Sequence, residues 1–224
     1  MTETSAHAAP VQQALQALQA QGLHPAADSL PRLLDYLALL ARWNRVYNLT
    51  AVREPAAMVV QHLLDCVAIW PPLRRHLGQP AAPTPVLDVG SGAGLPGAVL
   101  AILDPLLEVT CVDAVAKKAG FVQQVAAELG LPNLRAVHAR VQDLPAGAGY
   151  AVITSRAFAS LADFVALTAP LLAREGVWLA MKGRRPDDEI AALPRDTEVF
   201  HVEPLQVPGL EAQRCLVWMR RKDV

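Results

Sequence analysis

The residues of this chain best suited to chemistry lie in one short segment, Val86-Leu-Asp-Val-Gly-Ser-Gly-Ala-Gly-Leu-Pro-Gly97. Glycines recur at positions 90, 92, 94 and 97, directly after a run of residues with strand character. Because glycine lacks a Cβ and adopts positive φ without strain, such a turn lets the backbone approach a ligand closely. Pro96 suits the first turn of a helix, where an N–H would be unpaired anyway. The segment therefore predicts a strand, a tight turn and a helix whose N-terminus holds a nucleotide-like cofactor.

An acidic residue follows this turn at the spacing of a dinucleotide-binding fingerprint, about 20 residues further on. Asp113 ends a second apolar run over 107–112, and its carboxylate can accept hydrogen bonds from a ribose diol. A phosphate-binding P-loop is excluded because neither Gly-Lys-Ser nor Gly-Lys-Thr occurs. The nucleophile elbow of hydrolases is excluded as well, because Val89 rather than glycine stands two residues before Ser91.

The composition describes a folded protein without a global charge signal. The 224 residues are 53% hydrophobic and 18% charged, and the formal net charge is −1. A chain of this size and hydrophobic content can form one full α/β domain with an appendage. The low net charge excludes a global basic field, so any binding of nucleic acid must come from local basic patches.

The cysteines and the hydropathy of the chain indicate the cellular compartment that we expect for this protein. Cys66, Cys111 and Cys215 are odd in number and widely spaced, so they predict neither a disulfide framework nor a Cys-x-x-Cys metal site. The chain shows neither a secretory leader nor an uninterrupted apolar run of about 18 residues. We therefore expect a cytoplasmic protein that binds no metal and does not enter a membrane.

The first part of the chain predicts helices alone. Residues 1–9 are small and polar, and we expect them to be loose. Pro71-Pro72 and the Pro/Ala segment 80–85 are typical of helix breakers and linkers. The sequence thus predicts a helical appendage over 1–83 and a second unit over 84–224. The spacing of apolar residues predicts the helices of this appendage over 11–21, 29–47 and 55–69.

The rest of the chain alternates strands with helices, which is typical of a Rossmann-like, doubly wound α/β fold with a mostly parallel sheet. The end of the chain breaks this alternation, because two strands follow one another around Pro208-Gly209. They predict a hairpin at the sheet edge, and Pro204 fits an edge strand better than a central one. The expected helices are 97–104, 115–129 and 161–172. The seven expected strands are 86–89, 107–113, 134–139, 150–154, 177–181, 198–207 and 213–220.

A terminal hairpin on a doubly wound sheet resembles the class I S-adenosylmethionine-dependent methyltransferases. Seven short motifs narrow this resemblance: Asn48-Leu-Thr50, His62-Leu-Leu-Asp65, Asp88-Val-Gly-Ser-Gly-Ala-Gly-Leu-Pro-Gly97, Lys117-Lys118, Arg140-Val-Gln, Ser155-Arg-Ala157 and Lys182-Gly183. Taken together and in this order, they resemble the bacterial glucose-inhibited division protein B family, the ribosomal RNA small-subunit methyltransferase G. The resemblance runs from about Leu33 to the C-terminus.

This resemblance implies methylation of N7 of one guanine in a loop of 16S ribosomal RNA, with S-adenosylmethionine as the cofactor. Guanine N7 carries a free lone pair at neutral pH and the sulfonium methyl is already activated, so no general base is needed. We therefore expect no catalytic residue, only groups that position the reactants. N7 lies in the deep major groove of A-form RNA, so a loop guanine or an extruded one is the reachable target. The expected partner is 16S rRNA in the small ribosomal subunit or in an assembly intermediate.

The resemblance also implies which residues bind the cofactor. Gly90, Gly92 and Leu95 match the cofactor turn of the family. Asp88 would orient that turn or lie near the positive charge of the cofactor. Asp113 matches the position expected to hold the ribose hydroxyls.

Two further segments match cofactor or substrate positions of the family. Val141 and Gln142 match the contact to the adenine, where the family usually has a glutamate in place of Gln142. The exocyclic amine of adenine would then meet an amide carbonyl instead of a carboxylate. Arg156 follows the fourth expected strand, at the edge where ligands bind in such folds, so we expect it to contact the cofactor or the substrate.

A basic cluster and a polar pair complete the candidate residues. Lys182, Arg184 and Arg185 are close in sequence near the same rim, and we expect them to contact RNA phosphates. His62 and Asp65 could pair where the helical appendage meets the second unit, and we expect them to have a structural role.

Three alternatives remain open at this point. A methyltransferase for another acceptor would carry the same cofactor motifs, since these do not name the acceptor. A nicotinamide-dependent oxidoreductase would share the glycine spacing and Asp113, although the terminal hairpin and the joint motif set weigh against it. The third alternative is an RNA-binding accessory protein with an inactive pocket.

Overall fold

The computed structural model describes residues 3–78, 81–156 and 158–222 and has a seven-stranded sheet in the order β3-β2-β1-β4-β5-β7-β6. Strands β1 to β5 run parallel, whereas β7 pairs antiparallel with both β5 and β6. This confirms the predicted doubly wound sheet and its terminal edge hairpin. The strands are β1 Thr84–Val89, β2 Leu107–Asp113, β3 Leu134–His138, β4 Tyr150–Ser155, β5 Leu172–Lys182, β6 Thr197–Leu205 and β7 Arg214–Arg221.

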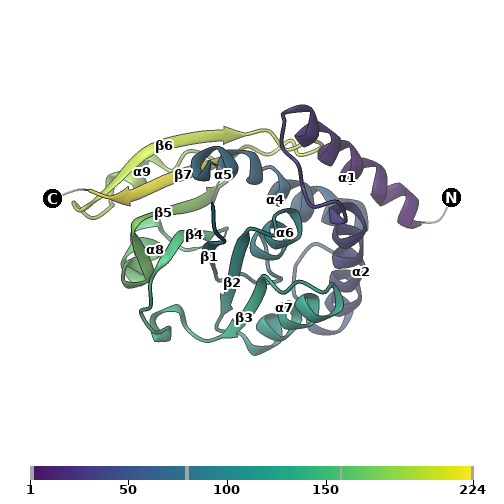
Figure 1. Cartoon of the computed structure of the whole chain (residues 1–224), viewed down its shortest axis with the longest axis horizontal. Helices are drawn as coiled ribbons and strands as arrows, with labels where there is room; N and C mark the ends of the chain where they lie inside the picture. Colours follow the sequence, from purple (N-terminus) through teal and green to yellow (C-terminus); the bar gives the residue numbers. More distant parts are fainter. Residues whose placement is uncertain (1–2, 79–80, 157, 223–224) are drawn as a thin grey trace.

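Helices cover both faces of this sheet. Figure 1 shows α8 on one side of the sheet, and α2, α6 and α7 on the other. A π-helical turn, η1 (Val59–Leu64), joins α3 to α4. The α-helices are α1 Glu3–Ala20, α2 Ser29–Tyr47, α3 Pro55–Met58, α4 Asp65–Val67, α5 Trp70–Leu77, α6 Gly97–Leu103, α7 Ala116–Glu128, α8 Leu161–Thr168 and α9 Asp187–Ala191.

Side chains of each strand alternate between two hydrophobic clusters, because successive residues of a strand point to opposite faces of the sheet. Val86 and Val152 belong to the larger cluster, to which the N-terminal helices also contribute. Leu87 and Ile153 belong to the smaller cluster, which includes residues of α8. A parallel sheet buried on both faces explains why its strands are continuous apolar runs in the sequence.

The N-terminal helices differ from the predicted ones in two places. Helix α1 begins at Glu3, so the expectation that residues 1–9 are loose is wrong for 3–9, while residues 1–2 lie outside the described residues. The helix is anchored by Val11, Leu15 and Leu18, which are buried, and the alanine-rich residues before them extend it. The predicted helix end near Ile69 is confirmed, because a turn at Ala68 and Ile69 separates α4 from α5. Pro71-Pro72 do not lie in a breaker segment, however, because they occupy the first turn of α5, where no N–H is needed.

The segment around α8 also differs from the prediction. Helix α8 ends at Thr168 rather than at position 172, and one 3-10 turn, Ala169–Leu171, follows it. Pro170 lies in this turn, where proline stops a regular helix. Strand β5 then begins at Leu172, five residues earlier than the expected start at 177. Pro204 lies in β6, which is the edge strand, as predicted.

The helical stretch Pro55–Leu77 is long and apolar enough to cross a membrane, but 67% of its apolar window is buried inside the protein. Leu63, Ile69 and Leu73 of this stretch are fully buried. Polar residues such as His62 interrupt the apolar run, which is why an uninterrupted run is missing from the sequence. The stretch is therefore a core helix of this fold.

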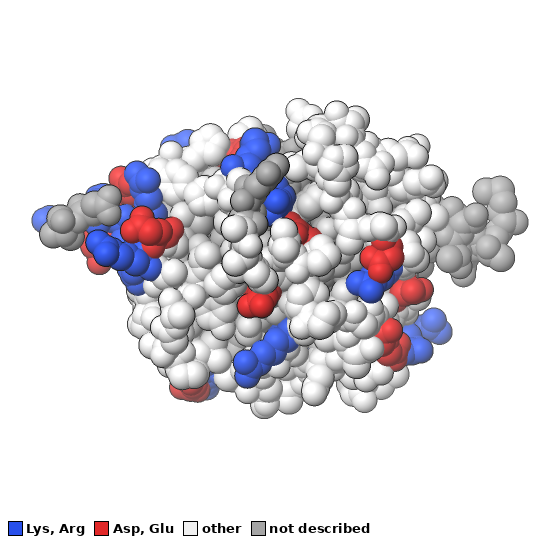
Figure 2. Space-filling model, viewed as in Figure 1, with Lys and Arg blue, Asp and Glu red and all other residues white. Residues whose placement is uncertain are grey.

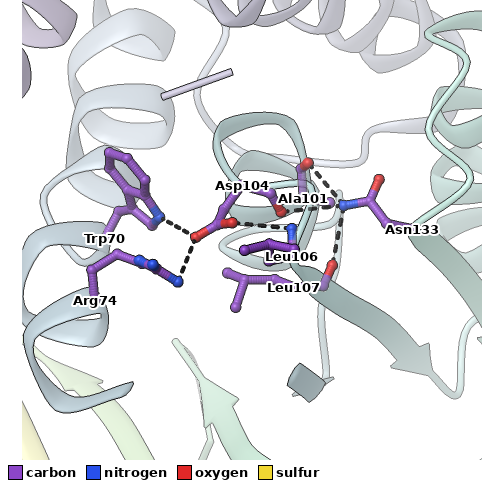
Figure 3. Close-up of polar contacts among 7 residues, drawn as sticks. All are labelled: Trp70, Arg74, Ala101, Asp104, Leu106, Leu107 and Asn133. Carbon is purple, nitrogen blue, oxygen red and sulfur yellow. Dashed lines mark hydrogen bonds and ion pairs between the residues drawn. The ribbon is translucent and has the colours of Figure 1, made fainter. Parts of the chain in front are cut away.

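A buried polar cluster fixes the start of β2 against α5 (Figure 3). Asp104 Oδ2 accepts a hydrogen bond from Trp70 Nε1 at 3.0 Å and lies 3.4 Å from Arg74 Nη1. Its Oδ1 accepts from Leu106 N at 3.1 Å. On the other side of the same turn, Asn133 Nδ2 donates to the carbonyls of Ala101, Asp104 and Leu107 at 3.0, 3.4 and 3.1 Å. These contacts hold the connection between α6 and β2 from two sides.

We predict that Asp104→Ala lowers the free energy of unfolding by about 3 kcal/mol, because it leaves a buried indole N–H and a largely buried guanidinium without a partner. The matched control is Glu128→Ala, which removes the exposed ion pair with Arg42. An exposed pair contributes at most about 1 kcal/mol. Urea unfolding monitored by circular dichroism measures both variants, and equal losses would contradict the structural role of Asp104.

Candidate active site

The turn after β1 has the backbone geometry that the glycines predict. Gly90 and Gly92 have φ angles of 64° and 59°, and a Cβ placed on either would meet nothing within 4 Å. The N–H groups of Gly90 and Ser91 donate to Val112 O at 2.9 and 3.2 Å. The space over the turn is therefore open, while its underside is tied to β2. A side chain at position 90 or 92 would be strained by its φ and would project into that space.

Asp88 holds the start of α6 from inside the sheet. Its side chain is fully buried, and Oδ2 accepts a hydrogen bond from Gly97 N at 2.8 Å. Its other oxygen, Oδ1, has no hydrogen-bond partner among the described residues. Burial raises the pKa of Asp88 to about 7, and the bond from Gly97 and the charge of Arg156 oppose this rise. Of the two roles expected for Asp88, the geometry favours orienting the turn.

Gly97 must lack a side chain for this contact to form. A Cβ at this position would lie 2.5 Å from Cys111 Sγ and 2.9 Å from Asp88 Oδ2. Both distances are shorter than any normal contact of a Cβ atom. The glycine therefore serves close packing of α6 against β1 and β2.

Asp113 ties the glycine turn to the start of α7. Its Oδ2 accepts from Gly92 N at 2.9 Å and its Oδ1 accepts from Val115 N at 2.8 Å. Lys118 Nζ lies 3.8 Å from Oδ2. Because a carboxylate offers about four acceptor sites, two oxygens that each accept one N–H can accept further hydrogen bonds.

A cavity of about 290 Å³ opens beside this turn, at the carboxyl ends of β1, β2 and β3. We call it the nucleotide cavity. The side chains of Leu95 and Asp88 do not line it, because Leu95 is 2% exposed and Asp88 is fully buried. Four of the residues predicted to bind the cofactor do line the cavity: Gly90, Asp113, Val141 and Gln142. Val89, Val112 and Phe158, which were not predicted, line it as well. An open backbone turn beside an acidic strand end fits the ribose and base of a nucleoside.

A second cavity of about 370 Å³ lies farther along the same edge of the sheet. Arg156 follows β4, Lys182 ends β5 and Arg214 begins the antiparallel β7, so the sheet brings all three to one edge. We call this space the charged cavity. Its lining residues are Gln61, His62, Asp65, Arg156, Met181, Lys182, Gly183 and Arg214.

Asp65 organises the cations of the charged cavity. Its Oδ1 accepts from Arg214 Nε at 2.9 Å, and its Oδ2 lies 3.7 Å from Arg156 Nη1. Arg156 Nη1 also donates to Gln61 O at 3.1 Å. The π-helical turn leaves this carbonyl available, because the N–H of Asp65 bonds instead to the carbonyls of His62 and Val60. Burial raises the pKa of Asp65, and the charges of Arg214 and Arg156 lower it.

His62 contacts the neighbouring loop rather than Asp65. Its Nε2 lies 2.8 Å from Thr50 Oγ1, and no hydrogen bond joins His62 to Asp65 in the described part of the chain. The pairing of His62 with Asp65 considered from the sequence is therefore wrong. Burial, followed by the charge of Arg156, lowers the pKa of His62 to about 4, so the ring is neutral at physiological pH.

Sequence reasoning did not assign Gln61 or Arg214 to the site and gave His62 and Asp65 only a structural role. A usable signal was Asp65 itself, because a carboxylate within an apolar helical run must be buried against a cation. The identity of that cation was not readable, since Arg214 lies 149 residues away.

The predicted basic cluster is largely matched by carboxylates. Lys182 Nζ lies 2.8 and 3.0 Å from the two oxygens of Glu189, and Arg185 Nε lies 2.6 Å from Asp187 Oδ1. Arg184 is exposed and forms no ion pair within the described ranges. Within those ranges there is also no group of three potential metal ligands.

A parallel sheet extended by an antiparallel hairpin, with an open glycine turn after β1 and an acid after β2, defines a class I methyltransferase fold. TrmN from Thermus thermophilus shares it with a TM-score of 0.55 and 21% identity, over 73% of this chain and 53% of that chain. A SAM-dependent methyltransferase from Aquifex aeolicus shares it with a TM-score of 0.53 and 16% identity, over 74% of this chain and 93% of that one. At these identities the likeness concerns the fold alone.

The chain belongs to the rRNA small subunit methyltransferase G family, whose model matches residues 29–217. A relative from Methylibium petroleiphilum is 58% identical over 212 residues, covering 91% of this chain and 95% of the relative. One from Leptothrix cholodnii is 59% identical over 206 residues, covering 92% and 93%. Both are named ribosomal RNA small subunit methyltransferase G. The chain is therefore an S-adenosylmethionine-dependent rRNA methyltransferase, and the alternatives of an oxidoreductase and of an inactive accessory protein are set aside.

The raised pKa of Asp88 predicts a pH-dependent stability. A carboxyl whose folded pKa of about 7 exceeds its unfolded value of 3.8 stabilises the fold below pH 4, and this contribution is lost as the pH rises through 7. We therefore expect the stability of the wild type relative to Asp88→Asn to fall by on the order of 2 kcal/mol between pH 5 and pH 8. Urea unfolding at both pH values measures this, and a constant difference would contradict it.

Proposed function

We propose that this enzyme transfers the methyl group of S-adenosylmethionine to N7 of a guanine in 16S rRNA, across the boundary between the two cavities. The observation that carries this proposal is their placement. Both cavities open at the carboxyl edge of the sheet, and the chain after β4 contributes to each, because Arg156 lines the charged cavity and Phe158 lines the nucleotide cavity. Membership of the family indicates that the reaction carried out between these cavities is methyl transfer to rRNA.

The nucleotide cavity would hold the adenosine part of the cofactor. Asp113 has acceptor capacity left for the ribose hydroxyls, and the open backbone at Gly90 permits close approach. Gln142 is exposed at the cavity and would accept a hydrogen bond from the adenine amine, next to the buried Val141. Asp88, Gly92 and Leu95 would act by fixing the turn. Bound in this way, the cofactor supplies an activated methyl group.

The charged cavity would position the guanine without resisting the reaction. Attack of N7 on the methyl carbon moves a positive charge onto the purine, so unpaired cations around it would oppose the transfer. Here Asp65 lies between Arg156 and Arg214, and Glu189 pairs with Lys182, so these cations are largely matched. They can donate hydrogen bonds, for example to guanine O6, at little cost in repulsion. No residue of this cavity needs to take a proton, because N7 is unprotonated.

The substrate would be a loop guanine of 16S rRNA, met within the small ribosomal subunit or an assembly intermediate in the cytoplasm. A-form RNA hides N7 in its deep major groove, so an unstacked base is required. Lys182 lines the charged cavity, and Arg184 and Arg185 follow it in the chain. Arg184 would contact a phosphate directly, whereas Lys182 and Arg185 would do so in exchange for their ion pairs with Glu189 and Asp187. The helices of residues 1–83 would form an appendage that closes one side of the site, with 84–224 as the methyltransferase domain.

Methyl transfer tests this function directly. Radiolabelled S-adenosylmethionine is incubated with the enzyme and with 16S rRNA or small-subunit particles from a strain that lacks this methyltransferase, and the modified base is mapped. We expect one N7-methylguanine in a loop, with transfer reduced at least about 100-fold in Arg156→Ala. Methylation at another atom or of another acceptor would contradict the proposal.

The amide at position 142 suggests a substitution that should raise the affinity for the cofactor. We expect Gln142→Glu to tighten binding of S-adenosylmethionine by about 5-fold, because a carboxylate accepts a stronger hydrogen bond from the adenine amine. The control is Gln12→Glu, which makes the same charge change on the exposed face of α1. Calorimetric titration measures the affinity of both variants for S-adenosylmethionine. If Gln142→Glu binds it no more tightly than the wild type, the adenine does not contact position 142.

A further inference from the structure

Apolar side chains are exposed where the end of α2 meets the start of α7. Val46 is 70%, Tyr47 43% and Val115 40% exposed, and they are three of the six large apolar side chains that the described residues leave exposed. Lys117 Nζ donates to Tyr47 O at 2.8 Å and so joins the two helices at this point. We call this surface the α2–α7 rim. It comprises Arg45, Val46, Tyr47, Arg53, Val115 and Lys117.

The basic residues of the rim are not matched by carboxylates. Arg53 donates to Asn48 Oδ1 at 2.9 Å and Lys117 to a carbonyl, and neither they nor Arg45 forms an ion pair among the residues that the structure describes. Elsewhere on the surface, pairs of opposite charge are frequent, such as Arg42–Glu128, Arg185–Asp187 and Arg220–Glu198. In a chain with a net charge of −1, the rim is therefore locally positive.

The rim borders the candidate active site. Val115 directly follows Asp113 and Ala114, which line the nucleotide cavity. The loop after Tyr47 carries Thr50, whose hydroxyl contacts His62 of the charged cavity. On the face that Figure 2 shows, charged residues form small separate groups, several with both signs, and no extended basic area is visible.

We propose that the α2–α7 rim binds the single-stranded RNA that flanks the target guanine, an inference that rests on the proposed function. Tyr47 packs on Trp43, with ring centroids 5.0 Å apart, and its exposed part offers a platform on which a base can stack. Arg53, which bonds the adjacent Asn48, and Lys117, which bonds the Tyr47 carbonyl, offer donors for phosphates beside this ring. Arg45 adds an exposed cation on another face of the end of α2. Aromatic stacking combined with nearby cations is how proteins bind single strands without reading their sequence. The N-terminal helices thus supply part of the RNA-binding surface.

Two variants of the full-length enzyme separate charge from stacking. The double variant Arg45→Ala/Arg53→Ala removes two exposed cations, and its charge-matched control is Arg135→Ala/Arg174→Ala, which removes two exposed cations outside the rim. We expect the rim variant to weaken binding of unmethylated 16S rRNA about 10-fold and to lower the slope of log K against log salt by about 1 to 2. We expect Tyr47→Leu to weaken binding about 10-fold without changing that slope, and Tyr47→Phe to bind like the wild type.

Binding of the RNA is measured by fluorescence anisotropy, apart from methyl transfer, so the two proposals fail in different ways. Wild-type enzyme that binds the RNA but transfers no methyl to guanine N7 overturns the proposed function, and the rim is still judged from binding. Rim variants that bind naked RNA like the control overturn the rim as an RNA surface. If they lose binding only to ribosomal particles, the rim contacts a protein and the proposal is equally overturned. The affinity for S-adenosylmethionine is expected to be unchanged in every rim variant.

Discussion

One hydrogen bond, from the N–H of Gly97 to the buried carboxylate of Asp88, sets the geometry on which the rest of the site depends. It fixes the first residue of α6 against β1, and the absence of a Cβ at Gly97 lets the helix lie this close to β2. The glycine turn connects β1 to α6, and on its other side Asp113 holds it through the N–H of Gly92. The cost is a carboxyl group buried where its charge is disfavoured.

Much of the fold was predictable because its determinants are local. The alternation of apolar runs, the glycines from 90 to 97 and the Pro208-Gly209 turn each act within a few residues, and they indicated the sheet, the turn and the edge hairpin. The errors fell at the ends of elements, such as α1, α8 and β5, and the short helix α9 was not predicted. Pro71-Pro72 starts a helix rather than ending one, since proline is compatible with a first turn, and only tertiary packing decides between the two.

Part of the nucleotide cavity was predictable from the same local signals, since the glycine turn and the strand end indicated Gly90 and Asp113. Val141 and Gln142 also line it, but only the resemblance to the family indicated them. The charged cavity was predictable only in part. Arg156 and Lys182 follow strands of the parallel sheet and could be placed at its edge, but Arg214 reaches Asp65 across 149 residues through an antiparallel strand. No periodicity in the sequence encodes such a contact, because it depends on how the helical stretch Pro55–Leu77 packs on the sheet.

The π-helical turn Val59–Leu64 gives the charged cavity an unusual dependence on chain length. A π-turn is equivalent to one residue inserted in an α-helix, and each residue rotates the helix by about 100°. Loss of Val59 or Leu63 from this turn would rotate Asp65 away from Arg214 and close off the Gln61 carbonyl, although every side chain that lines the cavity would still be present. In this turn the number of residues, rather than their identity, determines the geometry of the charged cavity.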